Sequence, residues 1–166
     1  MKKHALIAAT SLLLAGPALA QQNGPEYNLE AVELCIDNNS FSAQVGALGN
    51  TSQKVAQSLY DYFVKTAKAG KVPFKEMGDK PCGKWAVDFT VQATNGNPRA
   101  WLATLTVSDN KVYASLDKND VYSYPVVVWW DSLFGYTSSN DGLAQYLIAA
   151  GKELIDGLLD DYTSVN

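Results

Sequence analysis

Apolar and polar residues alternate along the stretch from Trp85 to Trp130, and this pattern constrains the fold more than any other feature of the chain. A period of two predicts strands with one buried side and one solvent-facing side. The first predicted strand, 85–94, ends at Asn95-Gly96, a pair that suits a hairpin turn. The second, 99–108, carries four apolar residues on one side: Trp101, Ala103, Leu105 and Val107.

Two more strands are expected before the stretch ends. Residues 111–116 form a short one after the turn candidate Asp109-Asn110, and residues 122–130 form the most apolar one. Because apolar side chains occupy both faces of the last strand, we expect it to lie centrally in the sheet or under cover on both sides. Pro125 cannot donate to a strand ladder, so this strand should begin at an edge or a bulge. Residues 131–140 are expected to form a loop.

One helix is predicted before this stretch and one after it. Asn50 or Thr51 caps the first, whose apolar residues recur at helical spacing as far as Gly70, the expected left-handed C-cap. The last helix, about residues 140–162, carries an apolar stripe. Gly151 lies on this stripe, where we expect close approach to a strand.

The order of the elements predicts the fold. A strand at residues 29–37 precedes the first helix, and an irregular crossing at 72–84 leads to the alternating stretch. The order strand, helix, four strands, helix predicts a single α+β domain. We expect a mixed, mostly antiparallel sheet of four to five strands, with two helices packed on one face and the first strand in the sheet interior.

The first 20 residues have the form of a secretory signal peptide. Lys2 and Lys3 precede an apolar run, and Ala18-Leu19-Ala20 provides the small-residue cleavage pattern. We therefore expect cleavage after Ala20, a flexible leader at 21–27 and the folded domain at 28–166, with no transmembrane segment after cleavage. The alternative is a retained anchor helix, but the apolar run is short for a membrane span. The expected location is periplasmic or extracellular.

Cys35 and Cys82 are the only cysteines, and the expected compartment is oxidising. We expect them to form a disulfide, which contributes about 4 kcal/mol when it closes a loop of this length. The alternative, a redox-active pair, lacks the Cys-x-x-Cys spacing that lowers a thiol pKa.

The absence of histidine from the expected mature chain excludes several kinds of site. The single histidine, His4, lies in the signal peptide. A Ser-His-Asp or Cys-His catalytic device therefore cannot form, and zinc and copper sites usually recruit imidazole. The chain contains no glycine-rich phosphate loop and no dinucleotide fingerprint. We expect no metal, no cofactor and no enzymatic activity.

Charge argues against a nucleic-acid partner. Removal of residues 1–20 leaves 17 acidic and 11 basic residues, a net charge of −6. Seven of the acids lie in residues 119–166, where Lys152 is the only basic residue. An acidic C-terminal face repels polyanions, and its simplest interpretation is a solvated helix surface.

Carboxylates remain as candidates for chemistry. Asp88 lies in the middle of a predicted strand on its polar face, and Asp131 follows the most apolar strand. A glycan hydrolase needs two carboxylates at a set separation, so this pair supports an alternative function as a carboxylate-dependent hydrolase. The simpler interpretation places both residues at the surface or in turns.

Aromatic residues are the candidates for binding. Trp129 and Trp130 are neighbours on a predicted strand and must point to opposite faces, so one of them belongs to the core. The other, near Tyr122, Tyr124 and Tyr136, could stack on a sugar ring or anchor a protein partner. The simpler interpretation, which we favour, is an aromatic core that holds them all.

The C-terminal region resembles that of a group of small secreted bacterial proteins of mostly unknown function. The resemblance covers about a quarter of the chain, and its residues are Trp130-Asp131, Gly135, Leu158, Asp161-Tyr162 and Val165-Asn166. The order of elements also resembles the small periplasmic domains of outer-membrane export and assembly accessory proteins, although the lipid-attachment cysteine usual in those proteins is absent here. The resemblance implies a place in the cell envelope and a non-catalytic role, and it transfers no site residue.

These observations favour a non-catalytic binding or assembly protein of the bacterial cell envelope, with an envelope protein as its partner. A glycan-binding protein or glycan hydrolase is the alternative, and a purely structural envelope component is a third interpretation. Two structural features separate them: which tryptophan is exposed, and where the two carboxylates lie.

Overall fold

The computed structural model describes residues 26–111, 113–117, 120–123 and 125–166. The predicted signal peptide, residues 1–20, and most of the predicted leader lie outside these residues. The described elements, in chain order, are η1 (Glu26–Leu29), β1 (Leu34–Ile36), α1 (Thr51–Gly70), β2 (Phe74–Glu76), β3 (Ala86–Ala93), β4 (Arg99–Asp109), β5 (Tyr113–Asp117), β6 (Asp120–Ser123), β7 (Val126–Thr137) and α2 (Asn140–Val165).

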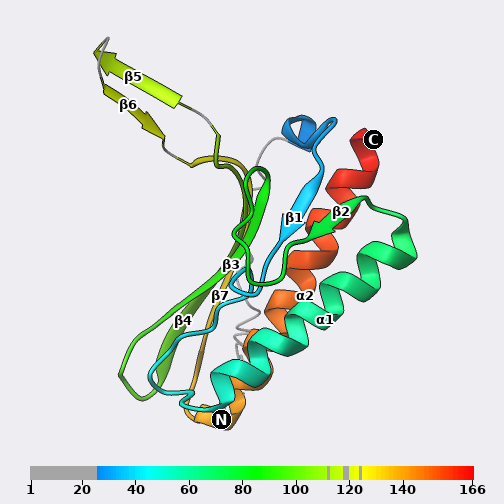
Figure 1. The fold of residues 1–166 in the computed structure, drawn as a ribbon. Helices are drawn as coiled ribbons and strands as arrows, with labels where there is room; N and C mark the ends of the chain where they lie inside the picture. The colour runs from blue at the N-terminus through cyan, green and yellow to red at the C-terminus, as the bar shows by residue number, and fades with distance from the viewer. Residues whose placement is uncertain (1–25, 112, 118–119, 124) are drawn as a thin grey trace, which may run out of the picture.

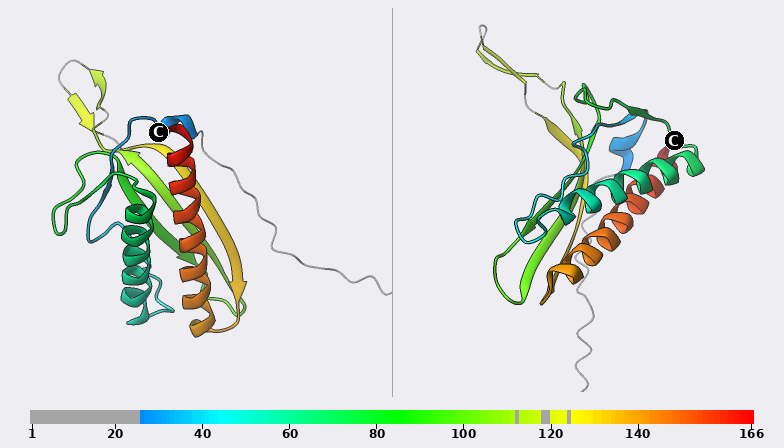
Figure 2. Two further views of the ribbon diagram at one scale, coloured as in Figure 1. Left: turned by 90° about the vertical axis from the view of Figure 1, so that its right-hand side faces the viewer. Right: turned by 60° about the horizontal axis from the view of Figure 1, so that its bottom comes forward.

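A five-stranded mixed sheet with the strand order β2-β1-β3-β4-β7 organises the described part of the chain. The strands β3, β4 and β7 are antiparallel, whereas β1 runs parallel to both of its neighbours. The helices α1 and α2 lie side by side on one face of this sheet (Figures 1 and 2). The predicted α+β fold is therefore confirmed, including the first strand in the sheet interior.

The core lies between the sheet and the two helices. Every fourth residue of α1 from Val55 to Ala67 is buried, which gives the helix one continuous apolar stripe. The predicted buried sides of β3 and β4 face this stripe and the apolar side of α2, as the register of Val87 with Val107 and of Phe89 with Leu105 requires. At the end of α2 the Tyr162 hydroxyl donates to the Val32 carbonyl oxygen over 2.7 Å. These contacts leave the opposite face of the sheet without helical cover.

The first strand is shorter than predicted. Residues 26–29 form a 3₁₀ helix, and Ala31 has a left-handed backbone with φ of 57°, so the expected strand at 29–37 reduces to Leu34–Ile36. All three residues of β1 are buried. A parallel strand between two neighbours is covered on both faces, and its burial is therefore continuous instead of alternating.

The region after α1 also differs from the prediction. The left-handed C-cap is Lys71, with φ of 57°, and Gly70 remains inside the helix. The segment expected to be irregular contains β2, which pairs in parallel with β1. Because β2 has only three residues, periodicity had no length over which to reveal it.

The largest correction concerns the last two predicted strands. The predicted strand 111–116 corresponds to β5, which begins at Tyr113 and does not join the sheet; β5 pairs with β6 in a separate two-stranded hairpin that projects from the body (Figure 1). The predicted strand 122–130 is divided between β6 and β7. The predicted loop 131–140 is mostly strand, since β7 continues to Thr137 alongside β4. As Pro125 indicated, β7 begins after it with a bulge, in which Val128 has no partner on β4.

Strand β7 is an edge strand, and the expectation of a central or doubly covered strand is wrong. Its only strand neighbour among the described residues is β4. Its apolar residues on the second side are exposed instead of buried, as Val127 at 50% and Phe134 at 52% illustrate. The apolar run therefore predicts that a strand is present, but it does not predict the position of that strand in the sheet.

Two glycines of α2 allow a test of the packing between the helices. Gly151 approaches α1 and not a strand: a Cβ there would lie 2.6 Å from Leu59 Cδ2, and Leu59 is fully buried. We expect Gly151→Ala to destabilise the protein by about 1–3 kcal/mol through overpacking. Gly157→Ala is the matched control, because a Cβ there meets no atom within 4 Å. It should stabilise the helix by about 0.5–1 kcal/mol.

Urea unfolding of the oxidised protein measures both changes in the free energy of unfolding. A Gly151→Ala variant as stable as the wild type would show that α1 and α2 do not pack as closely as described.

Candidate functional site

The adjacent tryptophans of β7 point to opposite faces of the sheet. Trp129 is 1% exposed and faces the helices, where its Nε1–H donates to the Asp161 carboxylate over 2.9 Å. It is a core residue that joins β7 to α2. Trp130 is 37% exposed on the other face.

Trp130 belongs to a group of exposed apolar side chains on the uncovered face, which we call the open-face patch: Leu102, Trp130, Phe134 and Tyr136. Trp130, Phe134 and Tyr136 share one side of β7 because their positions along the strand differ by even numbers. Leu102 on β4 lies directly opposite Phe134. Phe134 and Tyr136 are 52% and 72% exposed, so this patch contains apolar surface that the fold itself does not use.

Polar residues interrupt the open-face patch, and a depression lies beside it. Ser132 lies between Trp130 and Phe134 on the same side of β7, opposite Thr104 of β4. A depression of about 370 Å³ adjoins the patch, and its lining includes Gln92, Leu102 and Phe134. The surface thus combines aromatic anchors with hydrogen-bonding groups, as partner-binding surfaces generally do.

The other predicted aromatic residues are not placed at this patch. Tyr124 lies outside the described residues, and Tyr122 lies in β6 with a side chain that the structure does not describe. Phe134 and Leu102 were not predicted. Residues 132–137 show no regular alternation of apolar and polar residues, and Gly135 made the segment resemble a loop, so the sequence contained no clear signal for Phe134.

The reason for Gly135 is a close contact on the covered face. A Cβ at this position would lie 2.6 Å from the Trp101 indole, which stacks on Tyr146 of α2. The glycine therefore makes room for a core tryptophan while β7 continues past it.

The outer edge of β7, with which no described strand pairs, adjoins the patch. The sheet's opposite edge, β2, has three residues and is flanked by the ion pairs Lys75–Glu33 and Lys68–Glu76. By contrast, β7 has twelve residues, and its one charged side chain, Asp131, faces the helices. A side chain caps one end of the β7 edge, where the Asn28 amide nitrogen donates to the Val128 carbonyl oxygen over 2.9 Å. Long apolar edges of this kind accept additional strands.

The predicted disulfide between Cys35 and Cys82 is present, and it lies on the same uncovered face. Cys35 pairs in register with Ala86, whose side chain points away from the helices. The two cysteines, Ala86 and Met77 form a small apolar cluster of their own. The crossing segment that contains Cys82 therefore covers β1 and the Ala86 end of β3 on this face, whereas Thr90 and Gln92 farther along β3 are exposed. No described segment covers the β4 and β7 part.

The two candidate carboxylates lie on opposite faces of the sheet. Asp88 pairs with Thr106, which pairs with Trp130, so it shares the open face. Asp131 pairs with Leu105 and is buried on the helix side, at 8% exposure. A sheet separates them, so they cannot flank one glycosidic bond in the way that a glycan hydrolase requires.

Burial raises the pKa of both carboxyls. Burial raises the pKa of Asp131; the Ser132 N–H, 2.7 Å from Oδ1, acts in the opposite direction, and the charges of Asp161 and Glu153 raise it further. Burial also raises the pKa of Asp88, with a smaller contribution from the negative charge of Asp37.

Among the described residues, no group of three or more His, Cys, Asp or Glu side chains that could hold a metal ion occurs. Likewise, no helix in that part of the chain is long and apolar enough to cross a membrane.

Comparisons with known proteins leave the family open. No protein-family model matches the chain, and no curated protein sequence matches it. Among solved structures, a dodecamer of a PelC variant from Paraburkholderia phytofirmans is similar, with 12% sequence identity and a TM-score of 0.46. The similarity covers 84% of this chain and 96% of the PelC chain. At these values it carries no argument about function.

The raised pKa of Asp131 predicts a pH-dependent stability. The folded state takes up a proton at a higher pH than the unfolded chain, where an Asp pKa is about 3.9. The free energy of unfolding therefore increases as the pH falls through the folded-state pKa, and the gain is complete below the unfolded-state value. Asp131→Asn removes this dependence, so the variant should gain more stability relative to the wild type near pH 7 than near pH 3.

Urea titrations at the two pH values measure the difference. Asp160→Asn is the control, because it removes the same negative charge from an exposed position. Its difference in stability from the wild type should be the same at both pH values. Equal offsets for Asp131→Asn would contradict the proposed cost of burying its charge.

Proposed function

We propose that this chain is a non-catalytic binding or assembly protein of the bacterial cell envelope, and that it binds a protein partner through the open-face patch. The observation that carries the proposal is the exposure of Trp130, Phe134 and Tyr136 on one side of a strand that pairs along its length with β4. Aromatic side chains fixed in this way are typical anchors of protein interfaces.

The mode of binding that best fits is addition of a strand to β7. A partner strand along this edge would satisfy the backbone groups that point away from β4. Its alternate side chains would then extend the open face beside Trp130 and Phe134. The charged and short edge at β2 offers no equivalent template.

An envelope location is supported by two features. The first 20 residues have the form of a signal peptide, and the disulfide between Cys35 and Cys82 is of a kind that persists in oxidising compartments. The resemblance of the C-terminal region to small secreted bacterial proteins agrees with this location.

A non-catalytic role is supported by the residues available for chemistry. The only histidine precedes the expected cleavage point. The two candidate carboxylates lie on opposite faces of the sheet and so do not form a hydrolytic pair.

Photo-crosslinking in producing cells tests the open-face patch. With p-benzoylphenylalanine in place of Phe134, we expect a discrete adduct with an envelope protein. The same group in place of Tyr146, which is 53% exposed on α2, should give none. Trp130→Ala should weaken binding of the identified partner by about ten-fold or more, as loss of an interface anchor does, and Gln145→Ala, exposed on α2, is its control.

Each other result has a defined meaning. Equal adducts at positions 134 and 146, or binding unaffected by Trp130→Ala, would exclude the open-face patch as the binding surface. Adducts only with a second copy of the chain would assign the patch to self-association. Trp129→Ala is unsuitable for this test because it removes a buried core side chain.

A further inference from the structure

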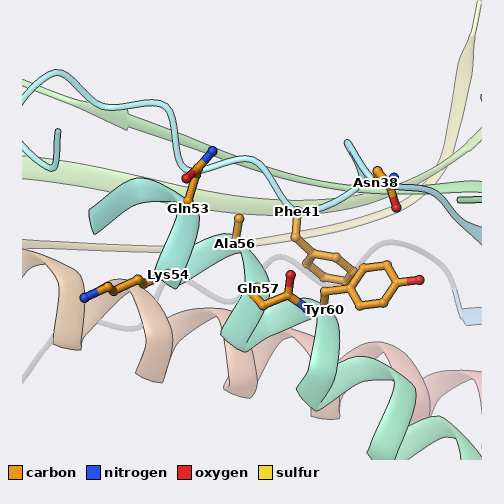
Figure 3. A pocket seen from close by; sticks show the side chains of 7 residues that line it. All are labelled: Asn38, Phe41, Gln53, Lys54, Ala56, Gln57 and Tyr60. Atoms are coloured by element: carbon orange, nitrogen blue, oxygen red, sulfur yellow. The ribbon is translucent and has the colours of Figure 1, made fainter. Parts of the chain in front are cut away.

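A second surface is the groove between α1 and the connection that leads from β1 to α1. Two adjoining hollows of about 540 and 420 Å³ make up this groove, and they share Asn38, Phe41, Gln53 and Ala56 (Figure 3). Volumes of this size are typical of small-molecule sites. The groove shares no residue with the open-face patch, so a ligand could bind there whether or not the open-face patch binds a partner.

The lining of the groove is rich in side-chain amides. Five amide residues contribute to it: Asn38, Asn39, Gln44, Gln53 and Gln57. Lys54 is the only charged residue in the lining of these two hollows, and no carboxylate belongs to it. The surface therefore suits a ligand that offers many hydrogen-bonding groups.

Two of these amides are oriented by neighbouring carboxylates. The Asn38 amide nitrogen donates to Asp79 over 2.6 Å, and the Gln57 amide nitrogen donates to Asp61 over 2.8 Å. These hydrogen bonds favour one orientation of each amide, in which the carbonyl oxygen is available as an acceptor. The groove thus presents the amide groups of Asn38, Gln53 and Gln57 together, with Lys54 in its lining.

An aromatic pair forms one end of the groove. The Tyr60 ring meets the buried Phe41 ring edge to face, with centroids 6.2 Å apart and an interplanar angle of 86° (Figure 3). The Tyr60 hydroxyl also lies 3.2 Å from the Glu76 carboxylate, to which it donates. The ring is held in place and offers an apolar surface beside the amides.

The backbone of the facing loop is already used by the sheet. The Ser42 N–H donates to the Phe89 carbonyl oxygen over 3.0 Å, and the Phe89 N–H donates to the Ser40 carbonyl oxygen over 2.6 Å. These hydrogen bonds tie the loop to β3. They also occupy the Ser42 N–H and the Ser40 carbonyl oxygen, which an extended peptide would otherwise need for pairing. What remains are side-chain amides and an aromatic ring.

We infer that this groove binds an oligosaccharide. Sugar hydroxyls both donate and accept, which matches a surface of amide side chains. The apolar C–H face of a pyranose ring would pack on Tyr60. The carboxylates of Asp61, Asp79 and Glu76, which hydrogen-bond to lining side chains, favour a neutral sugar, and Lys54 is the one positive charge in the lining.

Side-chain amide signals in NMR spectra of the isotopically labelled, oxidised protein test the inference. The probes are tetrasaccharides of glucose, of N-acetylglucosamine and of galacturonic acid, with trialanine as the peptide probe. We expect at least one tetrasaccharide to shift the side-chain signals of Gln53 and Gln57 at millimolar concentration. A stronger response to the galacturonic acid probe would identify Lys54 as a charge contact.

The double variant Gln53→Ala, Gln57→Ala should weaken this binding by about ten-fold, since two hydrogen-bonding side chains are lost. Both positions are exposed on α1, and alanine is a better helix former than glutamine, so the variant folds. Gln145→Ala, exposed on α2, is the matched control and should leave binding unchanged.

Three results would overturn the inference. The groove is not a sugar site if no tetrasaccharide shifts these signals, or if trialanine alone does so. It is also not the sugar site if a tetrasaccharide shifts the Trp130 indole signal and leaves Gln53 and Gln57 unchanged.

Discussion

The covering of only one face of the sheet by two helices is the constraint on which the rest of this structure depends. Once Trp129 is buried against α2 and bonded to Asp161, strand geometry turns Trp130 to the other face. The same alternation turns Phe134 and Tyr136 outward with it. The exposed aromatic side chains are therefore not an accident of packing at the surface; they follow from the choice of core residues one position away.

The second face of the sheet is protected unevenly, and this difference defines the candidate surface. On β1 and the Ala86 end of β3 the crossing segment covers the face and is held there by the disulfide of Cys35 and Cys82. On β4 and β7 no described segment takes its place. The two edges differ in the same sense, because charge and shortness protect β2 whereas β7 is long and carries its one charge inward. The unprotected half and the unprotected edge meet at β7, which is why a partner strand is the simplest occupant.

The groove on α1 and the open-face patch are built from different chemistry. The patch relies on exposed aromatic area, and the groove relies on amides, two of which hydrogen-bond to Asp79 and Asp61. They use separate elements, so occupation of one leaves the other accessible. The two proposed activities can therefore be tested, and can fail, independently.

The sequence by itself determined the α+β class, the buried sides of β3 and β4, the helices and the disulfide. Each of these depends on local periodicity or, for Cys35 and Cys82, on there being a single possible pair. Only the tertiary structure decided that β7 lies at an edge, that β5 and β6 leave the sheet, and that Asp88 and Asp131 face apart. The physical reason is that an apolar strand has the same sequence pattern at the centre of a sheet and at its edge. Its place depends on pairing with distant segments, and that pairing also decides which side chains remain for a partner.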